Sequence, residues 1–187
     1  MRYFRICDSF KIADRWYLGT PRTLDGDEID PRQFIECSVY RRPGPLLVPI
    51  TEGKTSLDFT LGAFDMPVVA TRIAEAIEES APGGVQRIPV VIGDGIVGYE
   101  ALNVLNKLKG LDEKRSLISY WTPEDGLPEK VGTYFGVARI ALDTLVVADA
   151  QIFRLDGWEV PIIINEQVKE VLGKLRVTGI EVEALHT

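Results

Sequence analysis

Residues 151–185 read QIFRLDGWEVPIIINEQVKEVLGKLRVTGIEVEAL, and this stretch decides the fold. It predicts two strands, a helix and a last strand, at Gln151–Leu155, Pro161–Ile164, Asn165–Leu175 and Ile180–Leu185. Asn165 is a favoured N-cap, and Glu166 in the first turn suits the positive end of the helix dipole. Gly179 separates the helix from the last strand, so one helix is predicted among three strands.

A second helix and further strands are predicted nearer the N-terminus. One apolar face with helical spacing starts near Val69 and includes Ile73 and Ile77, and APGG at 81–84 ends it. Residues 101–108 are ambiguous, and their leucine spacing favours a helix over a strand. Other strands are predicted at Tyr3–Cys7, Arg15–Leu18, Leu46–Ile50, Asp58–Leu61, Gln86–Ile92, Ser116–Trp121 and Val137–Leu142.

The balance of these elements predicts the fold class. Strands outnumber helices, and strands and helices do not alternate regularly. The sequence therefore predicts an α+β fold, in which two or three helices pack on a mainly antiparallel or mixed sheet.

The size and hydropathy of the chain predict one cytoplasmic domain. Its 187 residues are 45% hydrophobic, which is enough for a core. We expect a single domain over 1–187, with 1–50 as a candidate loop-rich subregion. No apolar run reaches the roughly 18 residues of a membrane helix, and the first residues lack the apolar stretch of a signal peptide.

The charge is acidic and unevenly distributed. The net charge is −7, of which residues 51–100 contribute −5. A nucleic-acid-binding protein needs a basic surface, and the chain offers only the pair Arg41–Arg42. A basic protein is therefore the better expected partner, with neither a nucleic acid nor a membrane bound directly.

The residues that usually carry catalysis are scarce. His186 is the only histidine and lies next to the last residue, where a base is poorly held. Cys7 falls within a predicted strand, as a small buried apolar residue would. Cys37 falls in a predicted loop with no histidine near it in sequence. The spacing of these residues matches no metal site, so we expect no enzyme activity, no metal and no cofactor.

One glycine-rich stretch offers an alternative. Residues 93–98, GDGIVG, match the G-x-G-x-x-G pattern of dinucleotide-binding loops through Gly93, Gly95 and Gly98. Asp94 would place a carboxylate where a phosphate should lie. We interpret the stretch as a turn between two strands and keep a nucleotide site as the alternative.

Several stretches together resemble a known family. They are RYFRICD, RWYLGTP at 15–21, LDFTLGAFDMPVV at 57–69, VQRIPV at 85–90, YEALNVLNKLKGLDEKRS at 99–116, PEDGLPEKVGTY at 123–134 and residues 152–183. The chain resembles the eleventh immunity family of bacterial polymorphic-toxin systems over nearly its whole length. It departs from the family at Gly110, where an aliphatic residue or cysteine is common.

The resemblance implies a small cytoplasmic protein that binds the C-terminal domain of a toxin and protects the producing cell. Toxins paired with this family are often nucleases, so the partner is expected to be basic and nuclease-like. A non-toxin adaptor remains the other alternative.

Two acidic groups are the candidate toxin-binding residues. An acidic inhibitor can mimic phosphate and associate quickly with a basic toxin. The first group, on the predicted helix, is Glu75, Glu78 and Glu79. The second group, on either side of the strand predicted at Ser116–Trp121, is Asp112, Glu113, Glu124 and Asp125.

Overall fold

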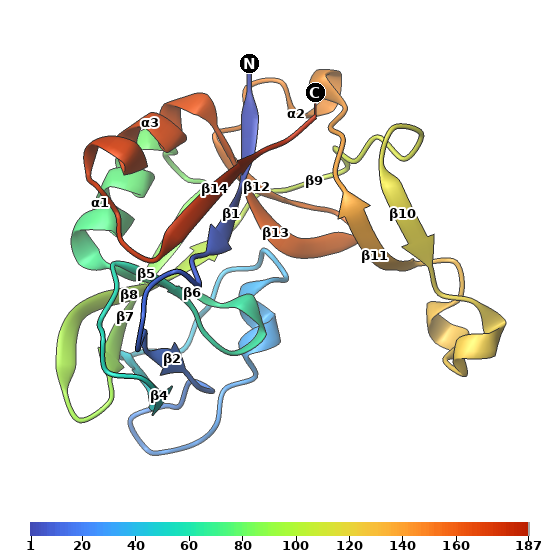
Figure 1. Ribbon diagram of the computed structural model, residues 1–187. Coiled ribbons are helices and arrows are strands. Elements are labelled where there is room, and N and C mark those ends of the chain that lie inside the picture. The colour runs from blue at the N-terminus through green and yellow to red at the C-terminus, as the bar shows by residue number, and fades with distance from the viewer. Residues whose placement is uncertain (187) are drawn as a thin grey trace.

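The computed structural model describes residues 1–186 and is built around two five-stranded sheets (Figure 1). The first sheet has the order β14 (Ile180–Ala184), β1 (Tyr3–Asp8), β13 (Trp158–Asn165), β12 (Ile152–Leu155) and β9 (Lys107–Leu108). The second has the order β3 (Leu46–Val48), β7 (Val85–Ile92), β8 (Ile96–Val104), β6 (Pro67–Ala70) and β5 (Phe59–Leu61). Neighbouring strands are antiparallel except in the pairs β12–β9 and β3–β7.

Two smaller ribbons and the helices complete the fold. The ribbons pair β2 (Tyr17–Leu18) with β4 (Ile50–Glu52), and β10 (Leu117–Tyr120) with β11 (Tyr134–Arg139). The α-helices are α1 (Thr71–Ser80), α2 (Thr144–Val147) and α3 (Glu166–Lys174). Short 3-10 turns are η1 (Pro31–Phe34), η2 (Ala63–Asp65), η3 (Pro123–Asp125) and η4 (Pro128–Lys130). The predicted α+β fold with mixed sheets is confirmed.

Helices α1 and α3 lie together over the junction of the two sheets (Figure 1). Ile73 and Ile77 of α1 share one buried cluster with Val168 and Leu172 of α3. Residues from both sheets complete this cluster, and they include Phe4, Phe59, Leu102, Ile152 and Ile164. One continuous apolar core therefore joins the two sheets.

The start of α3 confirms the predicted cap. The Asn165 side chain accepts a hydrogen bond from the backbone N–H of Val168 at 3.0 Å. This bond satisfies one of the donors that a helix leaves free at its first turn. The helix ends at Lys174, and β14 follows at Ile180 as the sequence predicts.

The predicted start of α1 is wrong by two residues. Val69 and Ala70 belong to β6, where they pair with Glu100 and Tyr99 of β8. The helix begins at Thr71. The spacing of Val69 and Ala70 also fits the helix, but their pairing with β8 places them in the sheet.

The helix favoured at 101–108 is also wrong. Residues 101–104 lie in β8, between β7 and β6, and all four are buried. Both faces of this central strand are covered, so its side chains do not alternate between core and solvent. Even the polar Asn103 is buried, where its amide donates to the Ser38 carbonyl at 2.7 Å. Residues 107–108 form the short strand β9.

A buried carboxylate also connects the two sheets. Arg15 Nη2 donates to Asp8 Oδ2 at 2.8 Å, and the backbone N–H of Leu61 donates to Asp8 Oδ1 at 2.8 Å. Asp8 ends β1 and Leu61 ends β5, so this carboxylate bridges one sheet to the other. Burial raises the pKa of Asp8, against the opposing effect of the Leu61 N–H and the Arg15 guanidinium.

Candidate functional site

A two-stranded hairpin projects from the body of the molecule. We call residues 117–139 the arm: β10, β11 and the connection that carries η3 and η4 (Figure 1). A bridge between Leu111 and Leu142 lies at its base. Ile118 pairs with buried Val137. It packs against a buried apolar cluster beneath the arm, which includes Leu142, Phe153 and Ile163. An isolated two-stranded ribbon is marginally stable, so this anchoring keeps the arm ordered.

The arm exposes large apolar side chains. Leu117 is 60% exposed and Phe135 is 53% exposed. The Phe135 ring meets Trp121 edge-on, with ring centroids 4.8 Å apart. Lys130 Nζ lies 4.9 Å from the Trp121 ring centroid. The arm therefore offers an aromatic surface beside charged groups, which is the composition of interface hot spots.

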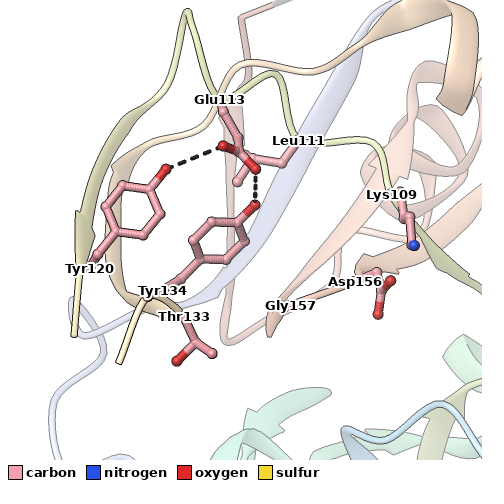
Figure 2. Close-up of a pocket in the computed structure, with 9 residues that line it drawn as sticks. Lys109, Leu111, Glu113, Tyr120, Thr133, Tyr134, Asp156 and Gly157 are labelled. Carbon is pink, nitrogen blue, oxygen red and sulfur yellow. Dashed lines mark hydrogen bonds between the residues drawn. The ribbon is translucent and has the colours of Figure 1, made fainter. Parts of the chain in front are cut away.

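A cleft of about 450 Å³ lies at the root of the arm (Figure 2). The Tyr134 phenol donates to Glu113 Oε1 at 2.6 Å, and the Tyr120 phenol donates to Glu113 Oε2 at 3.3 Å. The two tyrosine rings lie 5.7 Å apart at their centroids. Tyr134 also packs on Gly157, where an added Cβ would lie 3.1 Å from the ring.

The Glu113 carboxylate opposes the ionisation of both phenols. Its hydrogen bond and charge, together with burial, raise the pKa of Tyr134 to about 12. Burial and the charge of Glu113 also raise the pKa of Tyr120. Both hydroxyls donate to the carboxylate, and this contact moves their ionisation to higher pH.

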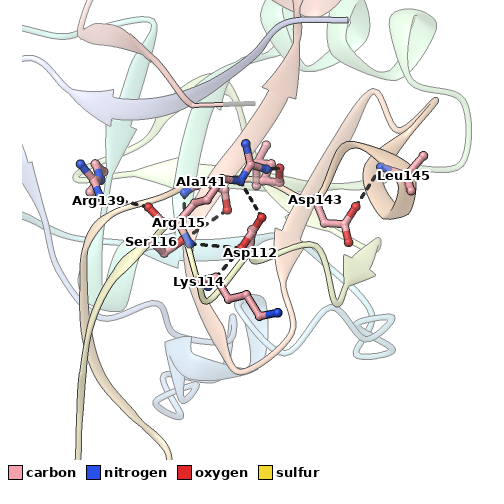
Figure 3. Close-up of polar contacts among 9 residues, drawn as sticks. Asp112, Lys114, Arg115, Ser116, Arg139, Ala141, Asp143 and Leu145 are labelled. Carbon is pink, nitrogen blue, oxygen red and sulfur yellow. Dashed lines mark hydrogen bonds and ion pairs between the residues drawn. The ribbon is translucent and has the colours of Figure 1, made fainter.

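Asp112 holds the turn that leads into the arm (Figure 3). It accepts hydrogen bonds from the backbone N–H groups of Lys114 and Arg115, at 3.0 and 3.2 Å. Arg115 Nε also donates to it at 2.6 Å, and this guanidinium holds the pKa of Asp112 below its usual range. Arg115 Nη2 reaches the Leu142 carbonyl at 2.8 Å, so the group ties both ends of the arm together.

Two acidic residues of α1 lie beside an arginine. Arg87 Nε and Nη2 donate to the two oxygens of buried Glu100, at 2.6 and 2.8 Å. Its guanidinium also lies 3.0 Å from Glu78 and 3.4 Å from Glu75. These contacts raise the pKa of Arg87 further, so it stays charged and offsets the carboxylates around it.

A family model described as an immunity protein family, Imm11, matches residues 5–187. The chain belongs to the Imm11 immunity protein family. Membership implies an immunity function through binding of a cognate toxin, and such proteins are generally non-enzymatic. Among curated proteins no match is found.

The predicted toxin-binding residues of this Imm11 chain lie in separate places. All three α1 residues are exposed; Glu75 and Glu78 pair with Arg87, whereas Glu79 does not. Glu113 lies in the root cleft, whereas Asp112 holds the turn. Glu124 and Asp125 lie in η3 near the end of the arm, where Asp125 and Thr122 form a capping box. The structure thus groups the second acidic set along the arm, away from the first.

The apolar residues of the arm were not predicted as functional. Tyr120 is 42% exposed and Trp121 is half-buried, although the sequence predicts only a strand there. Phe135 and Leu117 carried no signal of their own. The short turns rich in proline and glycine at 123–134 mark a long hairpin connection, and this is the feature that could have indicated an exposed arm.

The glycine-rich stretch forms a hairpin turn in this Imm11 chain. Gly93, Gly95 and Gly98 all have positive φ, and β8 follows the turn directly. A dinucleotide loop needs a helix N-terminus at that point, and a strand is there instead. The interpretation as a turn between strands is confirmed.

The cysteines, the possible metal ligands and the helix lengths give three further findings. Cys7 on β1 and Cys37 after η1 are both free and half-buried. Within residues 1–186 no cluster of histidine, cysteine and acidic side chains is placed to hold a metal. No helix in the same range is long and apolar enough to cross a membrane.

Proposed function

We propose that this protein neutralises a basic, nuclease-like toxin domain by forming a one-to-one complex in the cytoplasm of the producing cell. The arm is the observation that carries the proposal, because it projects from the body and exposes aromatic side chains. Buried aromatic anchors supply most of the energy at protein interfaces. Family membership supports toxin binding, and the chemistry of the toxin is our inference from charge.

The charge of the arm supports a basic partner. Its outer connection carries Glu124, Asp125 and Glu129 against one lysine, Lys130. All of these residues are exposed. A basic surface evolved to bind phosphate is attracted to such a group, and the attraction raises the association rate.

The α1 carboxylates are the competing contact surface. Glu75 and Glu78 share Arg87 with Glu100, so part of their charge is already offset. Glu124 and Glu129 have no ion-pair partner among the described residues. Since α1 and the arm lie on opposite sides of the molecule (Figure 1), we favour the arm as the primary contact.

Titration calorimetry with the purified C-terminal domain of the toxin encoded beside this gene tests the proposal. We expect one-to-one binding, protection of cells that co-express both chains, and an association rate that falls with added salt. A toxin domain from an unrelated system is the control. Absence of binding, or binding without protection, contradicts the proposal.

A further inference from the structure

We infer that the root cleft of the arm is a binding site for a guanidinium group, and that it receives an arginine side chain of the toxin. The inference rests on the proposed function for the identity of the partner. The cleft itself is defined by Glu113 between Tyr120 and Tyr134 (Figure 2).

Two phenols hold the Glu113 carboxylate in place, and they use only about half of its hydrogen-bond acceptor sites. An ionised carboxylate accepts about four hydrogen bonds through its two oxygens. Each oxygen of Glu113 accepts one phenol, from Tyr134 and from Tyr120. No arginine or lysine of the described chain pairs with it, in contrast to Asp112. Its remaining acceptor sites are therefore free for a donor from outside.

The two phenol rings supply the second element of a cation site. Their centroids are 5.7 Å apart with an angle of 54° between the rings. Tyr120 is 42% exposed, so its ring is open to a ligand. A cation over an aromatic face is attracted to the ring, and a planar guanidinium both stacks on a ring and donates in a fork to a carboxylate. An arginine side chain fits this combination better than a lysine does.

The charge distribution along the cleft places the cation at the tyrosine end. In Figure 2 Lys109 lies on the Asp156 side of the cleft, away from the two tyrosines. Asp156 already pairs with Lys107, whose Nζ lies 3.8 Å from Asp156 Oδ1, so Lys109 adds a positive charge at that end of the cleft. Glu113 supplies the negative charge at the tyrosine end of the cleft, where one guanidinium can pair with it.

A second carboxylate-lined hollow gives a contrast. It contains Glu78 and Glu100, but Arg87 of the same chain already occupies the position of the cation. In that hollow the guanidinium of Arg87 pairs with the clustered carboxylates. At the root cleft no such internal partner is present among the described residues.

NMR titration of the full chain with methylguanidinium tests the site without any toxin. We expect saturable shifts at Tyr120, Thr133 and Tyr134 with a dissociation constant of about 1–10 mM, which is the range for so small a ligand. Urea, which is planar but neutral, should give no saturable shift, and methylammonium should bind more weakly. Equal responses to urea and methylguanidinium, or shifts elsewhere, overturn the inference.

Variants separate the site from a general charge effect. Glu113→Gln keeps the shape and removes the charge, and it should abolish methylguanidinium binding. Tyr120→Leu should weaken binding at least about fivefold through loss of the ring. Glu52→Gln removes the same charge from an exposed residue of β4, outside the arm, and is the matched control, with unchanged binding. If Glu113→Gln binds as the wild type does, the inference fails.

Toxin binding by the same variants distinguishes the two proposals. Glu113→Gln should weaken toxin binding by about tenfold or more if an arginine enters the cleft. If the toxin binds both chains equally and methylguanidinium does not bind, the cleft inference fails while the proposed function stands. If the toxin does not bind the wild type but methylguanidinium does, the proposed function fails while the guanidinium site stands.

Discussion

The phenol of Tyr134 donates a 2.6 Å hydrogen bond to Oε1 of Glu113, and this contact fastens β11 to the segment that leads into β10. Because Glu113 raises the pKa of Tyr134 to about 12 from 10.0, the folded state favours the protonated phenol. The stabilisation is fully present below pH 10.0 and is lost as pH rises through about 12.

A spectroscopic titration of tyrosinate checks this relationship. Tyr134→Phe should remove the phenol that ionises near pH 12, and Glu113→Gln should move that ionisation back toward pH 10.0. Tyr17→Phe is the control, since it should leave the late ionisation in place. If Tyr17→Phe removes the late ionisation and Tyr134→Phe does not, the assignment to Tyr134 is wrong.

Truncation of Phe135 should weaken toxin binding without unfolding the chain. Phe135 is 53% exposed and touches Trp121, so Phe135→Ala is expected to cost about 2 kcal/mol of binding, a loss of about thirtyfold. The free energy of unfolding should change by less than about 1 kcal/mol.

A matched control for Phe135 lies on another hairpin. Val97 is an exposed apolar residue of β8, 71% exposed and outside the arm. Val97→Ala should leave the affinity for the toxin unchanged in the same calorimetric assay. Equal effects of the two substitutions would mean that the arm is not the contact surface.

Charge reversal on the arm should slow association. Glu124→Lys with Glu129→Lys should lower the association rate at low salt, and the difference from wild type should shrink as salt is added. Stopped-flow or surface-based kinetics measure both effects. Glu79→Lys on α1 changes an exposed carboxylate on the other side of the molecule, and a larger effect there would favour α1 as the contact surface.

Gly110 makes room for a buried neighbour. An added Cβ at Gly110 would lie 2.3 Å from Cγ1 of Val147, which is buried. We expect Gly110→Ala to lower the free energy of unfolding by about 1–3 kcal/mol through overpacking. Urea denaturation should show that Gly110→Ala costs much less in a Val147→Ala background, by at least about 1 kcal/mol. Additive effects of the two substitutions would contradict this explanation.

Asp58 should contribute stability only above acidic pH. Burial opposes its ionisation, but hydrogen bonds from Thr178 and the ion pair with Arg72 outweigh burial and lower its pKa below 3.8. A lowered folded-state pKa stabilises the fold above the unfolded value and loses that effect as pH falls through the folded value. Asp58→Asn should therefore destabilise the chain by about 1–2 kcal/mol at neutral pH and by less below pH 3.8. A difference that is constant with pH would refute it.

The sequence predicts the elements whose signals are local. Asn165 and the apolar spacing after it define α3, and the glycines at 93–98 define a turn. The sequence predicts a strand after the turn at 93–98 but not its extension through residues 101–104, because all four are buried, Asn103 included, and show no alternation of buried and exposed side chains. Helix α2 also had no prediction, although Asp143 caps it through the Leu145 N–H, because four residues give no measurable period.

The candidate site is harder to predict than the fold. The acidic residues are visible in the sequence, but their partners are not: Glu113 lies between two tyrosines that come 7 and 21 positions later. Glu75 and Glu78 pair with Arg87 of β7, and no pattern within the helix sequence indicates this contact. Whether a carboxylate is free or occupied depends on long-range packing, and that decides which acidic group can meet a partner.

Hydrogen exchange of the complex with the toxin domain tests the central claim most directly. The arm has few neighbours in the free chain, so its exposed amides should exchange quickly there. We predict that binding slows exchange most at residues 117–120 and 134–137, with smaller changes on α1. Slowed exchange that excludes the arm would contradict the assigned surface, and no slowing anywhere at saturating toxin would contradict the account as a whole.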